Sequence, residues 1–443
     1  MSVKSITSYP VRREHSPFLV VALVTLLTGI GAGFGGMGLA LLLHGIQHLA
    51  YGYSATHLIS AESFLQGVSG ASPERRVVVL TICGLVAGLG WWALYRYGRP
   101  LVSIRQAVKS DDPQMPLLST TIHALLQIVT VALGSPLGRE VAPREIGSAL
   151  AGWLSRRAGL SVAQSRIMVA CGAGAGLAAV YNVPLGGAVF VLEVLLGTFG
   201  VRALVPAIVT SAIAALVAQL GLGDEHQYLV PVLAVNASLI VWSLVCGPIF
   251  GVAAWGFTEL TKRSRAAAPK DWRLPVLSVL NFAIIGVLAM HFPQLLGNGK
   301  GPAGLAFDGG LTIGLAAMLL VLKVVITASS LRAGAEGGLL TPGLANGALL
   351  AIVLGGAWSL VWPGASSGGF AVIGATAFLA ASMQMPITAV VLMFEFTRVG
   401  QDFLIPVLFA VGGSLLAFQA CAKWAPKLQS ALGFNWSGAD KAR

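Results

Sequence analysis

A polar, glycine-rich stretch, GSPLGREVAPREIG at residues 134–147, interrupts two runs that are otherwise apolar enough for a bilayer. Inside a membrane, exposed amides and carboxylates have no water to satisfy them. Broken backbone and ionisable side chains are therefore tolerated only where they line a cavity or a binding site. The stretch carries Arg139 and Glu140. We expect Glu140 to be functional, and the alternative is a structural acid paired with Arg139.

Composition places this stretch in a polytopic membrane protein. The 443 residues are 56% hydrophobic and only 10% charged, with a mean hydropathy of +0.81, which leaves too little charged surface for a soluble globular protein. The net charge of +11 comes from short Lys and Arg clusters between apolar spans, a pattern typical of membrane topology rather than of nucleic-acid binding. Four dispersed cysteines have no metal-ligand spacing. We expect a lipid bilayer around the chain, and no nucleic-acid partner, metal or cofactor.

Charge clusters divide the chain into parts. We expect a basic cytoplasmic tail, a first membrane half, a basic cytoplasmic linker, a second membrane half and a C-terminal tail, at residues 1–16, 17–261, 262–273, 274–433 and 434–443. Both termini are then cytoplasmic. Lys323 is a lone cation inside an apolar run, and we expect it to snorkel or to form an internal ion pair.

The chain contains an internal repeat. Residues 171–194 align without gaps to residues 373–396, and the pairs Pro184/Pro386 and Glu193/Glu395 fall at equal spacing. Alanine and glycine matches are common in apolar sequence, whereas paired proline and glutamate are not. Because a duplicated acid at a helix end suggests a shared capping or packing role, we expect both glutamates to be structural.

A second polar stretch, GAEGGLLTPGLANG at residues 334–347, precedes its copy of the repeated segment as residues 134–147 precede the first. Paired Gly/Pro-interrupted segments in two halves indicate a midplane site built from helix ends. Helix N-termini present free N–H groups and the positive end of the macrodipole, which favours an anion. The predicted substrate is a small anion, which argues against a sodium-coupled transporter.

These motifs together resemble the CLC family of chloride channels and proton-coupled anion antiporters. The resemblance rests on GRE at residues 138–140, GLLTP at 338–342, NVPL at 182–185 and the segment 370–395, and it covers essentially the whole membrane region. It implies an all-α polytopic fold of two inverted halves, with about 17 to 18 tilted and half-membrane helices. It also implies a homodimer with one anion path per subunit, in a bacterial inner (plasma) membrane, without a regulatory domain.

The resemblance also implies a set of site residues. Glu140 becomes the gate and a proton-transfer group, with Glu336 as a second proton-transfer group or, alternatively, a helix-capping acid. The anion-binding positions are Gly138, Arg139, Val141, Gly338, Leu339, Leu340 and Thr341. An inner loop of the anion path, or else a basic cytoplasmic connection, is formed by Gly98, Arg99, Pro100 and Leu101.

Departures from the family pattern bear on the substrate. Val141 and Ala142 replace the Gly-Pro of the first motif, residues 98–102 contain no serine, and no tyrosine follows Tyr228. Val194 stands where chloride/proton antiporters of the family have an internal proton glutamate. These departures resemble the fluoride-transporting branch, so we expect fluoride/proton exchange. The alternatives are a chloride/proton antiporter, a chloride channel or, remotely, a membrane-embedded enzyme, although no HExxH or GxSxG motif occurs and we expect no enzyme.

Overall fold

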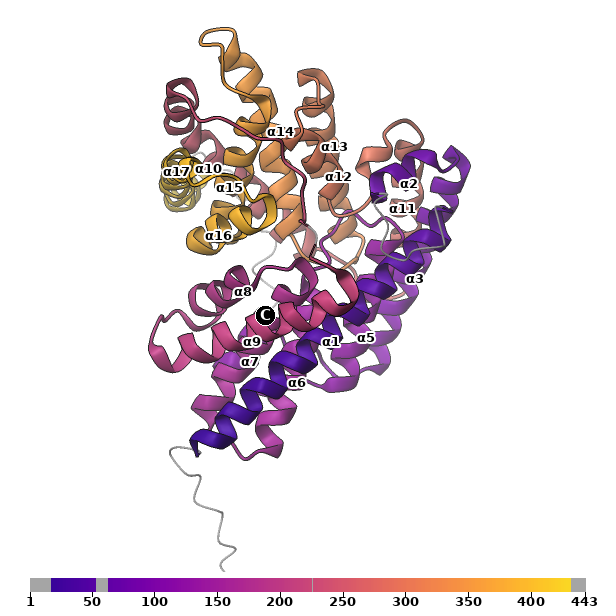
Figure 1. Cartoon of the computed structure of the whole chain (residues 1–443). Helices are drawn as coiled ribbons and strands as arrows, with labels where there is room; N and C mark the ends of the chain where they lie inside the picture. The colour runs from indigo at the N-terminus through magenta and orange to yellow at the C-terminus, as the bar shows by residue number, and fades with distance from the viewer. Residues whose placement is uncertain (1–16, 53–62, 225, 432–443) are drawn as a thin grey trace, which may run out of the picture.

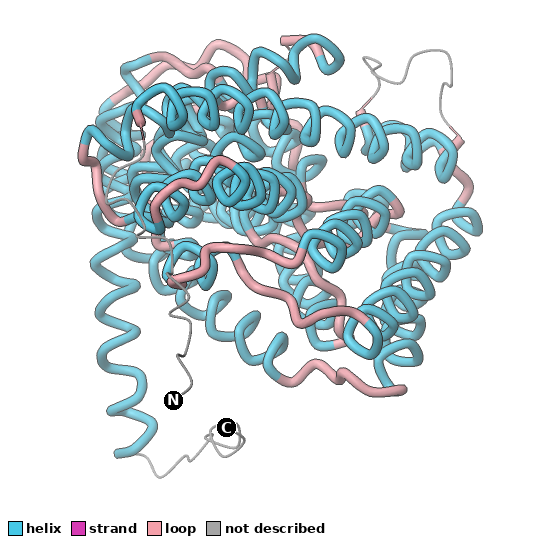
Figure 2. Tube along the Cα trace, turned by 90° about the horizontal axis from the view of Figure 1, so that it is seen from below, coloured by secondary structure: helices cyan, strands magenta, loops and turns pink. Residues whose placement is uncertain are grey.

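The computed structural model describes residues 17–52, 63–224 and 226–431, so both predicted tails, at 1–16 and 434–443, lie outside it. The described residues form 17 α-helices and three short helical turns. Figure 2 shows helices joined by loops, and within this part of the chain strand-like pairing is limited to one bridge between Gly138 and Gly338. The all-α prediction is confirmed.

The first half of the chain contains nine α-helices and one π-helical turn. They are α1 Phe18–Tyr51, α2 Phe64–Gly70, α3 Pro73–Tyr97, α4 Ile104–Lys109, α5 Leu117–Ala132, α6 Val141–Arg157, α7 Val162–Tyr181, α8 Pro184–Phe190, η1 Val191–Leu196 and α9 Val201–Leu222. Ser63, Ser103 and Ser161 begin α2, α4 and α7 with reciprocal side-chain caps that include a glutamine three residues later.

The second half contains eight α-helices and two 3₁₀ turns. They are α10 Ala237–Ala266, α11 Arg273–His291, η2 Pro293–Leu295, α12 Lys300–Phe307, α13 Ile313–Arg332, α14 Leu340–Ser359, α15 Ser367–Met383, α16 Pro386–Thr397, η3 Gln401–Phe403 and α17 Leu404–Ala431. Asn236, Thr312 and Ser366 cap α10, α13 and α15 through their side chains.

The backbone repeats between the halves. Gly134 and Gly334 both follow a helix end with positive φ, at 105° and 91°, a region that glycine enters without steric cost. Asn182 and Gln384 close α7 and α15 in the left-handed conformation, at φ values of 54° and 53°. The matching geometry supports the duplication inferred from sequence.

Figure 1 separates the two halves. Helices α6 to α9 lie in the lower part of the view and α12 to α17 in the upper part, while α3 and α11 pack together at the right. Within the described residues, nine helices are long and apolar enough to cross a membrane. Helices α5, α15 and α16 are apolar but shorter, as expected for half-membrane segments.

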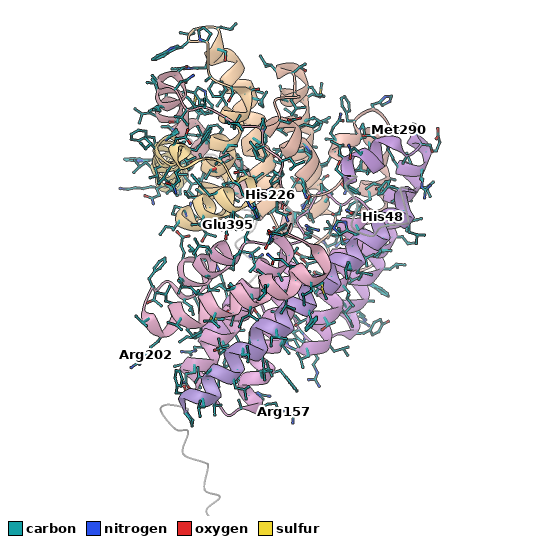
Figure 3. The ribbon with its side chains drawn as sticks, viewed as in Figure 1. His48, Arg157, Arg202, His226, Met290 and Glu395 are labelled. Carbon is teal, nitrogen blue, oxygen red and sulfur yellow. The ribbon has the colours of Figure 1, made fainter. Side chains whose placement is uncertain are left out.

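Glu193 and Glu395 tie the halves together at the position where Figure 3 labels Glu395. Glu193 accepts hydrogen bonds from the amides of Ile387 and Thr388, at 2.9 and 2.7 Å. Glu395 reciprocally accepts from the amides of Leu185 and Gly186, at 2.9 and 2.7 Å. Each glutamate therefore caps the short helix of the other repeat, which agrees with the structural role predicted for this pair.

Two local details differ from the sequence-based expectations. Helix α10 continues to Ala266, so the basic residues at 262–265 lie on its last turn rather than in a loop. Lys323 neither snorkels nor meets an acid among the described residues. It is fully buried, and its Nζ donates to the carbonyls of Leu295 and Gly297 at 3.2 and 2.7 Å.

Candidate functional site

Helices α6 and α14 begin beside each other at the centre of the molecule, because the loops that precede them pair. The amide of Gly138 donates to the carbonyl of Gly338 at 2.8 Å, and the amide of Gly338 donates back at 2.9 Å. Neither helix has a side-chain cap from its own N-cap residue, Glu140 or Leu339. The two polar stretches predicted to form a joint site therefore do meet, helix start against helix start.

The carboxylate of Glu140 occupies the start of α14. Its Oε1 accepts a hydrogen bond from the amide of Leu340 at 2.9 Å, and Oε2 accepts from the hydroxyl of Tyr181 at 3.4 Å. Glu140 is fully buried. Burying an ionised carboxylate costs several kcal/mol unless hydrogen bonds and local charge compensate it, and here a helix N-terminus supplies that compensation. A negative group thus sits in a place that suits an anion.

Gly138 and Gly338 make room for this carboxylate. A Cβ built on either glycine would overlap the oxygens of Glu140, so any side chain there would displace the carboxylate. Both glycines have ordinary negative φ values, because neither is among the positive-φ residues. The reason for glycine at these two positions is therefore space rather than backbone conformation.

Arg139 does not pair with Glu140 in the described structure. Its guanidinium lies over the ring of Tyr181, 5.2 Å from the centroid, and it is 8% exposed. Arg144 is the cation that holds the motif, since its Nε donates to the backbone carbonyl of Glu140 at 2.9 Å. The alternative interpretation of Glu140 as an acid paired with Arg139 is therefore wrong.

Tyr181 is a site residue that the sequence interpretation missed. Its hydroxyl lies 3.2 Å from Oγ1 of Thr341 as well as beside Glu140, so it connects α7 to the start of α14. The family pattern has its tyrosine near the C-terminus, whereas Tyr181 ends the first repeated helix. Its place directly before the NVPL motif at residues 182–185 was the available sequence signal.

Two pockets that share Tyr228 lie beside Tyr181 and the start of α14. The narrow pocket is lined by Arg139, Tyr181, Gln227, Tyr228, Asn298, Lys300, Thr341 and Phe396. A wider pocket of about 460 Å³ shares Tyr228 and is lined further by His226 and Arg398. Arg139 and Lys300 make the narrow pocket cationic, whereas Arg398 in the wider pocket is accompanied by Asp308 and pairs with Asp224 at 3.4 Å. Figure 3 labels His226 near the junction of the halves.

Glu336 does not line either pocket, and the contacts described for its carboxylate are with side chains. Its Oε1 accepts from the hydroxyl of Tyr95 at 3.2 Å, and its Oε2 lies 3.6 Å from Nε of Arg265. The side chain is 28% exposed. The described hydrogen bonds to Glu336 include none from a backbone amide, so the helix-capping alternative does not fit. Tyr95 is a second partner that the sequence interpretation missed.

The predicted inner loop, Gly98 to Leu101, connects α3 to α4. The amide of Arg99 donates to Oγ of Ser119 on α5 at 3.0 Å, and Ser103 caps α4 instead of facing the loop. A serine hydroxyl therefore does reach this loop, but from a different helix. The anion-path role of residues 98–101 stays a prediction. The anion-binding roles of Val141, which is the first residue of α6, and of Leu339, which is the N-cap of α14, also stay predictions.

The whole arrangement is a carboxylate held by a helix N-terminus beneath a cationic pocket. A metal centre is not indicated, because the described residues contain no group of three or more His, Cys, Asp or Glu side chains able to hold a metal ion. A small anion could replace the carboxylate at the amide of Leu340, and protonation would remove the charge that holds the carboxylate there.

Comparison with known proteins identifies the family. Residues 75–419 match the family described as voltage gated chloride channel. A putative ClcB-like chloride channel protein of Ralstonia nicotianae is 30% identical over 81% of this chain and 86% of its own length. The voltage-gated ClC-type chloride channel ClcB of Salmonella typhimurium is 26% identical over 87% and 92%.

Solved structures share the fold at 18% sequence identity. A slow cyanobacterial Cl⁻/H⁺ antiporter covers 95% of this chain and 100% of its own with a TM-score of 0.79. A CLC-type fluoride/proton antiporter covers 90% and 96% with a TM-score of 0.63. Because the family match spans most of the chain, this multi-pass membrane protein belongs to the voltage-gated chloride channel (CLC) family of anion transport proteins.

Proposed function

We propose that this protein exchanges a small anion, chloride in the first place, for protons across a bacterial plasma membrane, with Glu140 as the gate. The observation that carries the proposal is the bond from the amide of Leu340 to the carboxylate of Glu140, which puts the carboxylate where an anion would bind. Chloride comes first because the relatives that match over most of the chain are named as chloride channels.

The mechanism follows from competition at the start of α14. An incoming anion attracted by the cationic pocket competes with the ionised carboxylate for the amide of Leu340. Protonation of Glu140 removes its charge, so the favourable interaction with the helix N-terminus weakens and the side chain can leave. The anion then passes while the carboxyl carries a proton, and this exclusion couples the two fluxes.

The remaining parts of the proposal concern orientation and assembly. Glu336, beside the basic end of α10, takes part in proton transfer on the cytoplasmic side. Both termini lie in the cytoplasm, and two subunits form a homodimer in which each has its own path. A channel would use the same gate without proton counterflow, so proton movement separates the two functions.

Fluoride is the second candidate, favoured by the sequence at the gate. Val141 and Ala142 depart from the chloride-type motif, and the hydroxyl of Tyr181 offers a hydrogen-bond donor beside Glu140. Fluoride is a strong hydrogen-bond acceptor and suits such donors, including a protonated carboxyl. The solved fluoride/proton antiporter, at 18% identity, supports the fold and adds nothing on selectivity.

Ion efflux from proteoliposomes tests the proposal. The purified protein is reconstituted with internal chloride or fluoride, and anion efflux and proton uptake are recorded together, first singly and then with the other anion as competitor. Chloride efflux with matching proton uptake supports the proposal. Proton-coupled efflux of fluoride with no chloride efflux would show that the substrate is fluoride and not chloride. Anion efflux without proton movement would overturn the proposal that the protein is an exchanger.

A further inference from the structure

A second group of buried ionisable side chains lies on the helices around the gate. His123 on α5 places Nδ1 2.9 Å from Oε2 of Glu145 on α6. The side chains of His123 and Glu145 are only 10% and 12% exposed. The amide nitrogen of Gln127 lies 2.9 Å from the same Nδ1 and 3.2 Å from the same carboxylate. None of these three residues contacts the carboxylate of Glu140.

The geometry of this group allows one proton to be held in two places. With the proton on Nδ1, His123 donates to Glu145 and the Gln127 amide also donates to the carboxylate. With the proton on the carboxyl, the same amide can donate to the bare Nδ1. Gln127 therefore has a partner in either state. An ion pair kept only for stability would not need a donor placed within reach of both atoms.

Unpartnered polar atoms surround the pair. Nε1 of Trp91 and Oε1 of Gln127 are buried without a hydrogen-bond partner within the described structure, and both residues are 0% exposed. The ring of Trp91 packs edge-on against His123, with the centroids 6.3 Å apart. Buried polar atoms of this kind are the usual partners of internal water. Water there would extend the reach of a proton beyond His123.

The pair has neighbours in common with each of the two glutamates of the proposed mechanism, Glu336 and Glu140. On one side, Trp91 and Tyr95 stand one turn apart on α3, and Tyr95 donates to Glu336. His123 is within electrostatic reach of Glu336 and Arg265. On the other side, Glu145 follows Glu140 by five residues along α6, a rise of about 7.5 Å.

Arg144 links this second side to the gate. Its guanidinium bonds the backbone of Glu140 and is within electrostatic reach of the carboxylates of both Glu140 and Glu145. The further charged groups within electrostatic reach of the pair therefore include Arg144 on α6, Arg265 on α10 and Glu336 in the loop before α14.

We propose that His123 and Glu145, assisted by Gln127, form an intramembrane proton-binding site that passes protons between Glu336 and Glu140. The inference rests on the proposed exchange of an anion for protons. It assigns the proton path to the α3–α5–α6 side of the molecule, away from the pocket beside Tyr181 through which the anion enters.

The test compares proton and anion fluxes in proteoliposomes of four variants. Glu145→Gln and His123→Gln remove the titratable groups, and Glu145→Asp keeps the carboxylate. Glu259→Gln is the matched control. Glu259 forms an ion pair with Arg263, one turn later on α10, and the two side chains are 33% and 44% exposed. We expect the proton flux to fall about tenfold or more in the first two, and to recover toward wild type in Glu145→Asp.

The control should keep the wild-type proton flux. Anion flux above that of empty liposomes shows that a variant is folded, so a lower proton flux in such a variant reports proton transfer. If Glu145→Gln keeps the wild-type proton flux, or if Glu145→Asp loses as much proton flux as Glu145→Gln, the pair is structural and the inference is overturned. A wild-type protein that moves anions without protons would instead refute the proposed function itself.

Discussion

At the scale of single residues, the site depends on a carboxylate and on the two glycines that leave space for it. Gly338→Ala would place a methyl group on the oxygens of Glu140, so the carboxylate must leave the amide of Leu340. The same methyl group would fill the place that the anion takes once the carboxylate has left, so we expect anion flux to fall at least about tenfold. Gly412→Ala is the control, because nothing lies within 4 Å of a Cβ there. Chloride flux from proteoliposomes measures both, and wild-type flux in Gly338→Ala would contradict this account of the glycines.

Sequence drew attention to Glu140 but not to the side chains that contact it. An isolated acid in an apolar context pointed to Glu140, because its burial is costly in any fold. The contacts of Tyr181 with Glu140 and of Tyr95 with Glu336 were not predicted. Each tyrosine belongs to a helix far from its glutamate in the sequence, and no local sequence pattern indicates such a contact. Lys323 was misjudged for a similar reason: its partners are backbone carbonyls, which carry no signature in sequence.

At the scale of helices, the exchanged caps of α8 and α16 join the repeats. Each carboxylate accepts two amide bonds, so Glu193→Gln or Glu395→Gln replaces a charged acceptor by a neutral one at a helix N-terminus. We expect each change to lower stability by about 1–3 kcal/mol. Thermal unfolding in detergent measures the loss, with Glu259→Gln as the surface control.

A double variant sharpens this prediction. The two caps lie in the same small interface between α8 and α16, so the losses should not simply add. Melting temperatures that match wild type in both single variants would show that the caps do not stabilise the junction. Sequence predicted the structural role of this pair from its duplication, but it could not predict that each glutamate caps the opposite helix, because that requires the relative position of the two halves.

At the scale of the whole molecule, the two halves create the site by meeting. The all-α membrane class was predicted, because apolar runs and the family's motifs are visible in local sequence. A joint site was inferred from the two duplicated stretches, and the backbone pairing of Gly138 with Gly338 shows that the two loops meet. The anion itself was beyond reach of local patterns, since selectivity depends on distances among groups from α6, α7 and α14.

The central claim is that protonation of Glu140 couples proton movement to anion movement. Simultaneous recording of chloride efflux and proton uptake in proteoliposomes of the wild type and Glu140→Gln tests it most directly. Glutamine can still accept a bond from Leu340 but cannot ionise. The account predicts that proton uptake falls by about tenfold or more and that chloride efflux loses its dependence on pH. Undiminished proton-coupled efflux in Glu140→Gln would contradict the account.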